Sequence, residues 1–198
     1  MTITEMIKRV QRKHGLEEDG IAGIDTWTAI YESEIGDIPE PVEGAPVDER
    51  SETNITTLHP EVRPYARALI RKALDQGIVI KVISGTRTYE QQNALYEQGR
   101  SKPGPIVTKA RGGHSNHNFG IAFDIGLFEN GKYVPESPIY KVVGALGKEI
   151  GLEWGGDWTS IQDEPHFQLR PVWAKGMSES EMLATLRHRV DTGRDAYA

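Results

Sequence analysis

Residues 115–128 read SNHNFGIAFDIGLF, and this stretch carries the clearest fold signal in the chain. Apolar side chains alternate with small or polar ones from Ile121 to Phe128, which is the period-two pattern of a strand with one buried face. Asp124 shares its face with Ala122 and Gly126, opposite the apolar side chains. We therefore predict a strand whose carboxylate points away from the hydrophobic core.

A candidate metal site extends from this strand. His117 precedes Asp124 within the same stretch, and a third donor, His166, closes the segment DEPH at residues 163–166. Two imidazoles and one carboxylate leave one position of a tetrahedral zinc ion open for water, as in catalytic zinc sites. We expect one zinc ion per chain, although these donors do not exclude cobalt or manganese. Asp163 is the expected general base, with the adjacent Glu164 as the alternative.

The sequence around this site predicts an α+β domain, in which a small antiparallel sheet with flanking helices carries the zinc site. A second strand is expected at 164–170, where His166 and Gln168 alternate with apolar residues, and a third at the β-branched run 78–84. Helical spacing or capping signals predict four helices. These helices span about 61–76, 88–96, 140–150 and the segment after Ser178.

The first part of the chain predicts a short N-terminal helical unit, residues 1–36. Thr2 and Glu5 are spaced as a capping box for a first helix, and Asp25 is placed to cap a second one. Residues 37–53 are acidic and contain three prolines, so we interpret them as an extended linker. Residues 54–198 then form the catalytic domain.

Composition excludes several classes of function. The formal net charge is −6 and basic residues form no run, which argues against a nucleic-acid partner. No stretch is apolar enough to enter a membrane, and cysteine is absent, so any metal is held by His, Asp or Glu. No export signal is evident at residues 1–30, so we expect synthesis in the cytoplasm. We also expect a monomer.

Several separate motifs resemble the family of zinc D-Ala-D-Ala carboxypeptidases and L-alanyl-D-glutamate peptidases, most closely its bacteriophage endolysin branch. The resemblance covers roughly residues 58–171. The matching segments are SGTR at 84–87 with Gln91 or Gln92, GR at 99–100, GGHSNH at 112–117, GIAFD at 120–124, WGGDW at 154–158 and DEPHF at 163–167.

The resemblance implies roles for individual residues. His117, Asp124 and His166 bind zinc, Asp163 is the catalytic base, and Arg87 stabilises the negative charge that develops on the substrate carbonyl. Ser115 is similar to a family serine that contacts substrate or steadies a neighbouring ligand. Ser115, Gln92 and Trp158 are the candidate substrate-binding residues.

The string at residues 11–27 is similar to part of the peptidoglycan-binding module of wall hydrolases. Together the resemblances imply a zinc endopeptidase that cuts the L-alanyl-D-glutamate bond of peptidoglycan stem peptides. We expect a phage or prophage endolysin, which reaches the wall after a holin opens the membrane. The alternatives are a D-Ala-D-Ala carboxypeptidase or dipeptidase, whose substrate carboxylate could meet Arg100, Lys102, Lys109 or Arg111, and a non-catalytic wall-binding protein.

Overall fold

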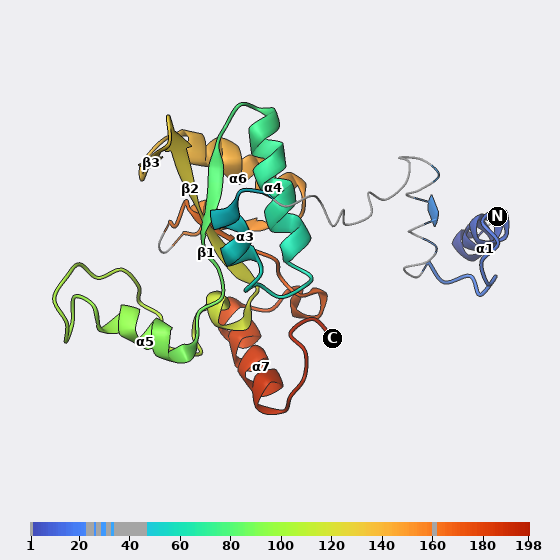
Figure 1. Ribbon diagram of the computed structural model, residues 1–198. Coiled ribbons are helices and arrows are strands. Elements are labelled where there is room, and N and C mark those ends of the chain that lie inside the picture. The colour runs from blue at the N-terminus through green and yellow to red at the C-terminus, as the bar shows by residue number, and fades with distance from the viewer. Residues whose placement is uncertain (1, 23–25, 27–28, 31–32, 34–46, 160–161) are drawn as a thin grey trace. The chain divides into compact units, whose positions relative to one another are not determined.

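The structure is a computed structural model that describes residues 2–22, 26, 29–30, 33, 47–159 and 162–198 (Figure 1). The chain divides into two compact units, Met1–Val42 and Glu43–Ala198. The larger unit contains all three candidate metal ligands.

A five-stranded sheet organises the larger unit, and every strand pair in it is antiparallel. Strand β2 (Ala122–Glu129) lies between β1 (Ile80–Ser84) and β5 (His166–Gln168), β4 (Glu153–Trp154) pairs with the far side of β5, and β3 (Lys132–Val134) pairs with the end of β2. This arrangement confirms the predicted α+β class with a small antiparallel sheet.

Helices flank this sheet, and the capping boxes expected at Thr88 and Ser178 are both present. The described helices of this unit are α3 (Glu49–Ile55), α4 (Arg63–Asp75), α5 (Tyr89–Glu97), α6 (Ile139–Glu149) and α7 (Glu179–Asp191). Short 3-10 turns lie beside the strands: η1 (Asn116–Phe119) precedes β2, η2 (Gly155–Asp157) follows β4 and η3 (Val172–Ala174) follows β5.

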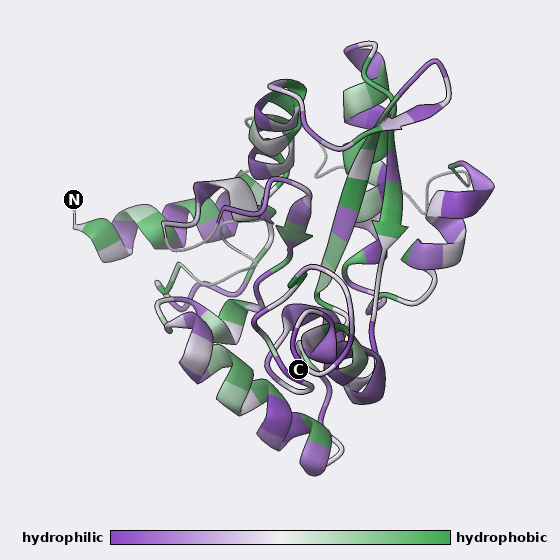
Figure 2. Ribbon diagram, turned by 90° about the vertical axis from the view of Figure 1, so that its left-hand side faces the viewer, coloured by the Kyte–Doolittle hydropathy of each residue, from purple (hydrophilic) through white to green (hydrophobic). Residues whose placement is uncertain are grey.

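The apolar face of β2 builds the main core, as its alternation predicts. Phe123, Ile125 and Leu127 are buried and pack in one cluster with residues of α4 and α6. Figure 2 shows hydrophobic residues along the paired strands, where this core forms. Asp124 lies on the opposite face, so its carboxylate is available to the candidate metal site.

Helix α6 packs directly on the aromatic residues of β4 and β5. A Cβ atom on Gly144 would lie 2.4 Å from the Trp154 ring, and one on Gly147 would lie 2.5 Å from Phe167. Only glycine permits this approach, because real Cβ atoms do not come so close to a ring. The helix therefore packs against β5, the short strand that contains His166, and helps to fix its position. Trp154 is a packing residue, and its indole nitrogen donates to the carbonyl of Glu164 at 2.7 Å.

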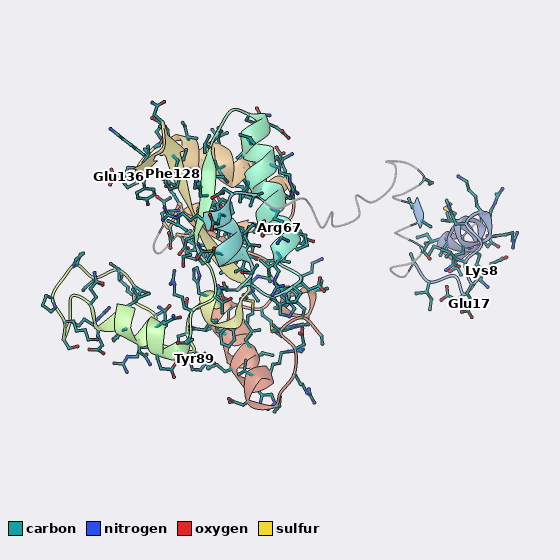
Figure 3. The ribbon with its side chains drawn as sticks, viewed as in Figure 1. Lys8, Glu17, Arg67, Tyr89, Phe128 and Glu136 are labelled. Atoms are coloured by element: carbon teal, nitrogen blue, oxygen red, sulfur yellow. The ribbon has the colours of Figure 1, made fainter. Side chains whose placement is uncertain are left out.

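A second apolar cluster joins α7 to η1, the turn that contains His117. Its buried members are Phe119, Ile121, Ala174, Met182, Leu183 and Leu186. Tyr89, labelled in Figure 3 at the start of α5, packs edge-on against Phe119 with ring centroids 6.3 Å apart. These contacts fix the position of η1 from two sides.

The structure shortens the predicted linker. Helix α3 begins within it, because Asp48 accepts the backbone N–H of Ser51 as an N-cap and Ser51 accepts the N–H of Val82 at 3.0 Å. Residues 37–46 of the predicted linker lie outside the described residues. The strand predicted at 164–170 is also shorter, and β3 and β4 were not predicted, since two or three residues carry no readable period.

The smaller unit begins with α1 (Ile3–Lys13), whose Thr2–Glu5 capping box is present as predicted. The buried Gln11 organises the loop that follows: its amide donates to Asp19 at 2.6 Å and accepts from the backbone of Gly20 at 2.9 Å. Most of the predicted second helix lies outside the described residues. No helix within the described parts of the chain has the length and hydrophobicity of a membrane span.

Candidate metal centre

His117 is held in η1 by a backbone contact. Its Nδ1 lies 2.8 Å from the carbonyl oxygen of Gly85, so a neutral ring donates there and keeps a lone pair on Nε2. The carbonyl of His117 in turn accepts the backbone N–H of Arg87 at 3.0 Å. The loop after β1 therefore positions the first candidate ligand.

Asp124 on β2 and His166 on β5 lie side by side, because the two strands are paired and these residues are in register. His166 Nε2 lies 3.0 Å from the side-chain oxygen of Gln168, which leaves Nδ1 as the nitrogen directed toward Asp124. Burial raises the pKa of the Asp124 carboxyl, but the imidazoles of His117 and His166 outweigh it and hold this pKa well below its usual range.

The three donor atoms form a nearly regular triangle. His117 Nε2 lies 3.2 Å from Asp124 Oδ1, and His166 Nδ1 lies 3.3 Å from each of them. A tetrahedral zinc ion with bonds of about 2.0 Å has ligand atoms roughly 3.3 Å apart, so the observed triangle fits one face of such a tetrahedron. Among the described residues, this is the one group of His, Asp and Glu that could hold a metal ion.

Arg87 pairs with the far side of the same carboxylate. Its Nη2 donates to Asp124 Oδ2 at 2.6 Å, the oxygen that does not face the imidazoles, and its Nε and Nη2 both reach the hydroxyl of Ser84. Its Nη1 donates to Gln92 at 3.3 Å. A guanidinium has five N–H groups, so one on Nη1 has no partner among the described residues and remains available beside the site.

Gln92 is fully buried, and its amide is used within the protein. Its oxygen accepts from Arg87, while its nitrogen donates to the carbonyl of Ala110 at 2.9 Å and to Thr108 at 3.3 Å. This burial does not suit the substrate contact predicted for Gln92. The structure instead makes this residue a support for the Arg87 guanidinium.

Asp163 lies at the edge of the metal centre, in the loop between η2 and β5. Its carbonyl accepts the N–H of His166 at 3.1 Å, and its own N–H donates to Gly155 at 3.0 Å. Burial, and then the charge of Asp124, raises the pKa of the Asp163 carboxyl, while both imidazoles and Arg87 oppose the rise. These mutual effects are consistent with a carboxyl group that lies near the candidate metal ligands.

The charge of Glu164, the alternative base, influences the Tyr140 hydroxyl. Burial, with a smaller effect from the charge of Glu164, raises the pKa of Tyr140 to about 12. The hydroxyl of Tyr140 contacts the backbone of Leu127 and Val134. Asp163 is therefore better placed than Glu164 to serve the metal centre.

Two of the predicted substrate-binding residues border the site. The half-buried Trp158 ring lies 4.8 Å from the ring of His166, centroid to centroid. Ser115 is half-buried immediately before η1, and its hydroxyl bonds to none of the described residues. Both positions permit the substrate contacts that the sequence predicts, and these contacts stay predictions.

Sequence reasoning missed a group of polar side chains behind His166. The alternation in β5 places Gln168 on the same face as His166, but it suggests no role for this amide. Asn116, Glu153, Arg170 and Glu179 join Gln168 in one hydrogen-bonded group, although they are far apart in the sequence. Only the three-dimensional structure brings them together.

Two imidazoles and one carboxylate around a single point, with a carboxylic acid beside them, form the arrangement of a metal-dependent hydrolase. A family profile described as D-alanyl-D-alanine carboxypeptidase matches residues 108–169, which include all three candidate ligands and Asp163. A second profile, described as a peptidoglycan binding domain, matches residues 2–30.

The chain is also similar to individual known proteins. The peptidoglycan L-alanyl-D-glutamate endopeptidase CwlK of Bacillus subtilis is 40% identical over 125 residues, covering 58% of this chain and 74% of the relative. The L-alanyl-D-glutamate peptidase of Listeria phage A118 is 32% identical over 141 residues, covering 66% of this chain and 47% of the relative. The solved L-Ala D-Glu endopeptidase ChiX of Serratia marcescens is 26% identical, covering 66% of this chain and 93% of that one, with a TM-score of 0.47.

The chain therefore belongs to the family of zinc D-Ala-D-Ala carboxypeptidases and L-alanyl-D-glutamate peptidases, as its motifs predict. It is a zinc metallopeptidase.

Proposed function

We propose that this chain is an endopeptidase that hydrolyses the L-alanyl-D-glutamate bond in the stem peptides of bacterial peptidoglycan. One observation carries the choice of bond: the two relatives described above, one bacterial and one from a phage, are named for this bond. The bacterial relative is matched over 74% of its own length, so the match extends well beyond the metal-binding motif.

In this proposal His117, Asp124 and His166 hold one zinc ion. When bound, zinc supplies Lewis-acid chemistry that activates water and polarises the scissile carbonyl at neutral pH. Asp163 accepts a proton from the attacking water and later delivers it to the leaving amine; the charges of the candidate ligands influence its carboxyl, and its pKa is raised. The free N–H on Nη1 of Arg87 donates to the carbonyl oxygen, where negative charge develops.

The N-terminal profile and the phage relative support a proposal for the role in the cell. We propose that the N-terminal unit binds the wall, since residues 2–30 match a peptidoglycan binding domain. We also propose that the protein is an endolysin, made in the host cytoplasm and released to the wall during lysis. The phage relative supports this role.

A second candidate activity is removal of terminal D-alanine from the stem peptide. The profile description favours it, and so does a group of four exposed cations, Arg100, Lys102, Lys109 and Arg111, that could bind a free carboxylate. None of the four forms an ion pair with another described residue, and the guanidiniums of Arg100 and Arg111 both lie over the Tyr96 ring.

Mass spectrometry of a defined muropeptide with an intact stem distinguishes these activities. The proposal predicts a fragment that begins with D-glutamate or its amide, and it predicts that a chelator prevents its release. Loss of a single D-alanine would assign the protein to the carboxypeptidase branch instead. An uncleaved muropeptide in the presence of bound zinc would contradict both proposed cleavage activities.

A further inference from the structure

Five side chains behind His166 form a closed ring of hydrogen bonds, which we call the polar ring. Arg170 donates from Nε to Glu153 and from Nη2 to Glu179. Glu153 accepts from the amide nitrogen of Gln168 at 2.7 Å, and Glu179 accepts from that of Asn116. The amide nitrogen of Asn116 also donates to the side-chain oxygen of Gln168, which closes the ring.

The two carboxylates in the polar ring determine how its amides are oriented. An ionised carboxylate only accepts hydrogen bonds, so the NH₂ groups of Asn116 and Gln168 must face Glu179 and Glu153. Arg170 holds both carboxylates in place. Gln168 is fully buried and Asn116 is 5% exposed, so water does not offer either amide an alternative partner.

This orientation leaves the oxygen of Gln168 directed at His166. The oxygen lies 3.0 Å from Nε2, so the ring nitrogen there must carry the hydrogen. A neutral imidazole has a single N–H, and Nδ1 therefore keeps its lone pair toward the metal centre. A rotated Gln168 amide would present N–H to Nε2 and would leave Nδ1 protonated, which blocks it as a ligand.

We propose that the polar ring sets the tautomer of His166 and thereby raises the affinity of the site for zinc. Gln168 and Glu153 are its principal positioning residues. The proposal depends on the assignment of His166 as a metal ligand, but not on which peptide bond the enzyme cuts. His117 needs no such device, because the carbonyl of Gly85 is a backbone acceptor that cannot rotate into a donor.

The test combines NMR of the metal-free protein, labelled with ¹⁵N in its histidine rings, with zinc titration. At a pH where both imidazoles are neutral, the wild-type spectrum should show His166 as the Nε2–H form alone. Gln168→Met, which removes the acceptor at similar volume, should populate the Nδ1–H form and weaken zinc binding roughly 10- to 100-fold. Glu153→Gln should give a mixture of tautomers with a smaller loss, because its amide no longer dictates the orientation of Gln168.

Three controls separate positioning from folding. The His117 signal of each variant should remain Nδ1–H, which reports an intact site in the same spectrum. Gln168→Glu retains an acceptor and should keep the Nε2–H form of His166. Gln76→Met, at the exposed end of α4, should change neither readout.

Two results would overturn the proposal. One is a wild-type His166 that carries its hydrogen on Nδ1. The other is a Gln168→Met variant with unchanged tautomer and zinc affinity. Should Gln168→Met fail to fold, Glu153→Gln decides the question, since Glu153 is 39% exposed and tolerates substitution. Because neither readout involves catalysis, failure here leaves the proposed cleavage reaction untouched.

Discussion

Asp163 illustrates how one residue obtains its chemistry from its place in the fold. Its backbone is fixed by Gly155 and His166, and its carboxyl is partly buried beside Asp124. Burial and the charge of Asp124 raise the pKa of the Asp163 carboxyl and make it a stronger base than an exposed aspartate. The sequence indicated this candidate role through the spacing before His166 and through the family resemblance.

Replacing Asp163 by asparagine should separate catalysis from metal binding. Loss of a general base typically costs 10²- to 10⁴-fold in rate, while zinc affinity should stay close to that of the wild type because the ligands remain. Steady-state kinetics and zinc titration of Asp163→Asn measure the two effects. Glu164→Gln is the matched control and should retain activity; if it loses activity while Asp163→Asn keeps it, the two carboxylates must exchange roles.

Zinc binding should depend on pH through His166. Burial lowers the pKa of this imidazole, but the hydrogen bond and charge of Asp124, together with Gln168 and Asp163, outweigh burial and raise the pKa above the ordinary value. A proton on Nδ1 excludes zinc, so affinity should be full at pH values above the raised pKa and should fall as the pH drops through it. Zinc titrations from pH 8 to pH 5 test this sign, and an affinity that rises on acidification would refute it.

Among the elements, helix α6 stabilises β4 and β5 by packing its backbone against their aromatic side chains. Gly144 and Gly147 let the helix backbone lie against Trp154 and Phe167, so any side chain there must displace an aromatic ring. Gly144→Ala and Gly147→Ala should each lower the free energy of unfolding by about 1–3 kcal/mol, despite the better helix propensity of alanine. Ala145→Ser, on the exposed face of the same helix, should change it by less than about 0.5 kcal/mol. Chemical denaturation measures all three, and a stabilised glycine variant would contradict the packing described.

The elements that the sequence predicts well are those with a long period or a complete cap. The alternation in β2 and the capping boxes at Thr88 and Ser178 act over several neighbouring residues, so local sequence contains the whole signal. Helix α3 was missed because its stability comes from distant partners, such as the backbone of Val82. The burial of Gln92 and the polar ring were missed for the same reason, since each depends on segments that are far apart in the chain.

At the scale of the whole molecule, the two compact units suggest a division of labour. If residues 2–30 bind the wall, removing residues 1–42 should reduce binding to insoluble peptidoglycan while hydrolysis of a soluble stem peptide changes little. Sedimentation with purified sacculi measures the first effect, and peptide kinetics measure the second. Circular dichroism of the shortened chain controls for folding. Equal sedimentation of both forms would remove the binding role from the N-terminal unit.

The central claim is that His117, Asp124 and His166 hold the one zinc ion on which hydrolysis depends. The most direct test removes metal from the purified protein, returns zinc in measured steps, and follows peptide cleavage alongside bound zinc. The account predicts that activity is absent without metal, rises in proportion to zinc and stops rising at one equivalent, and that His166→Ala abolishes both binding and activity. Full activity in the metal-free protein, or unchanged zinc binding in His166→Ala, would contradict it.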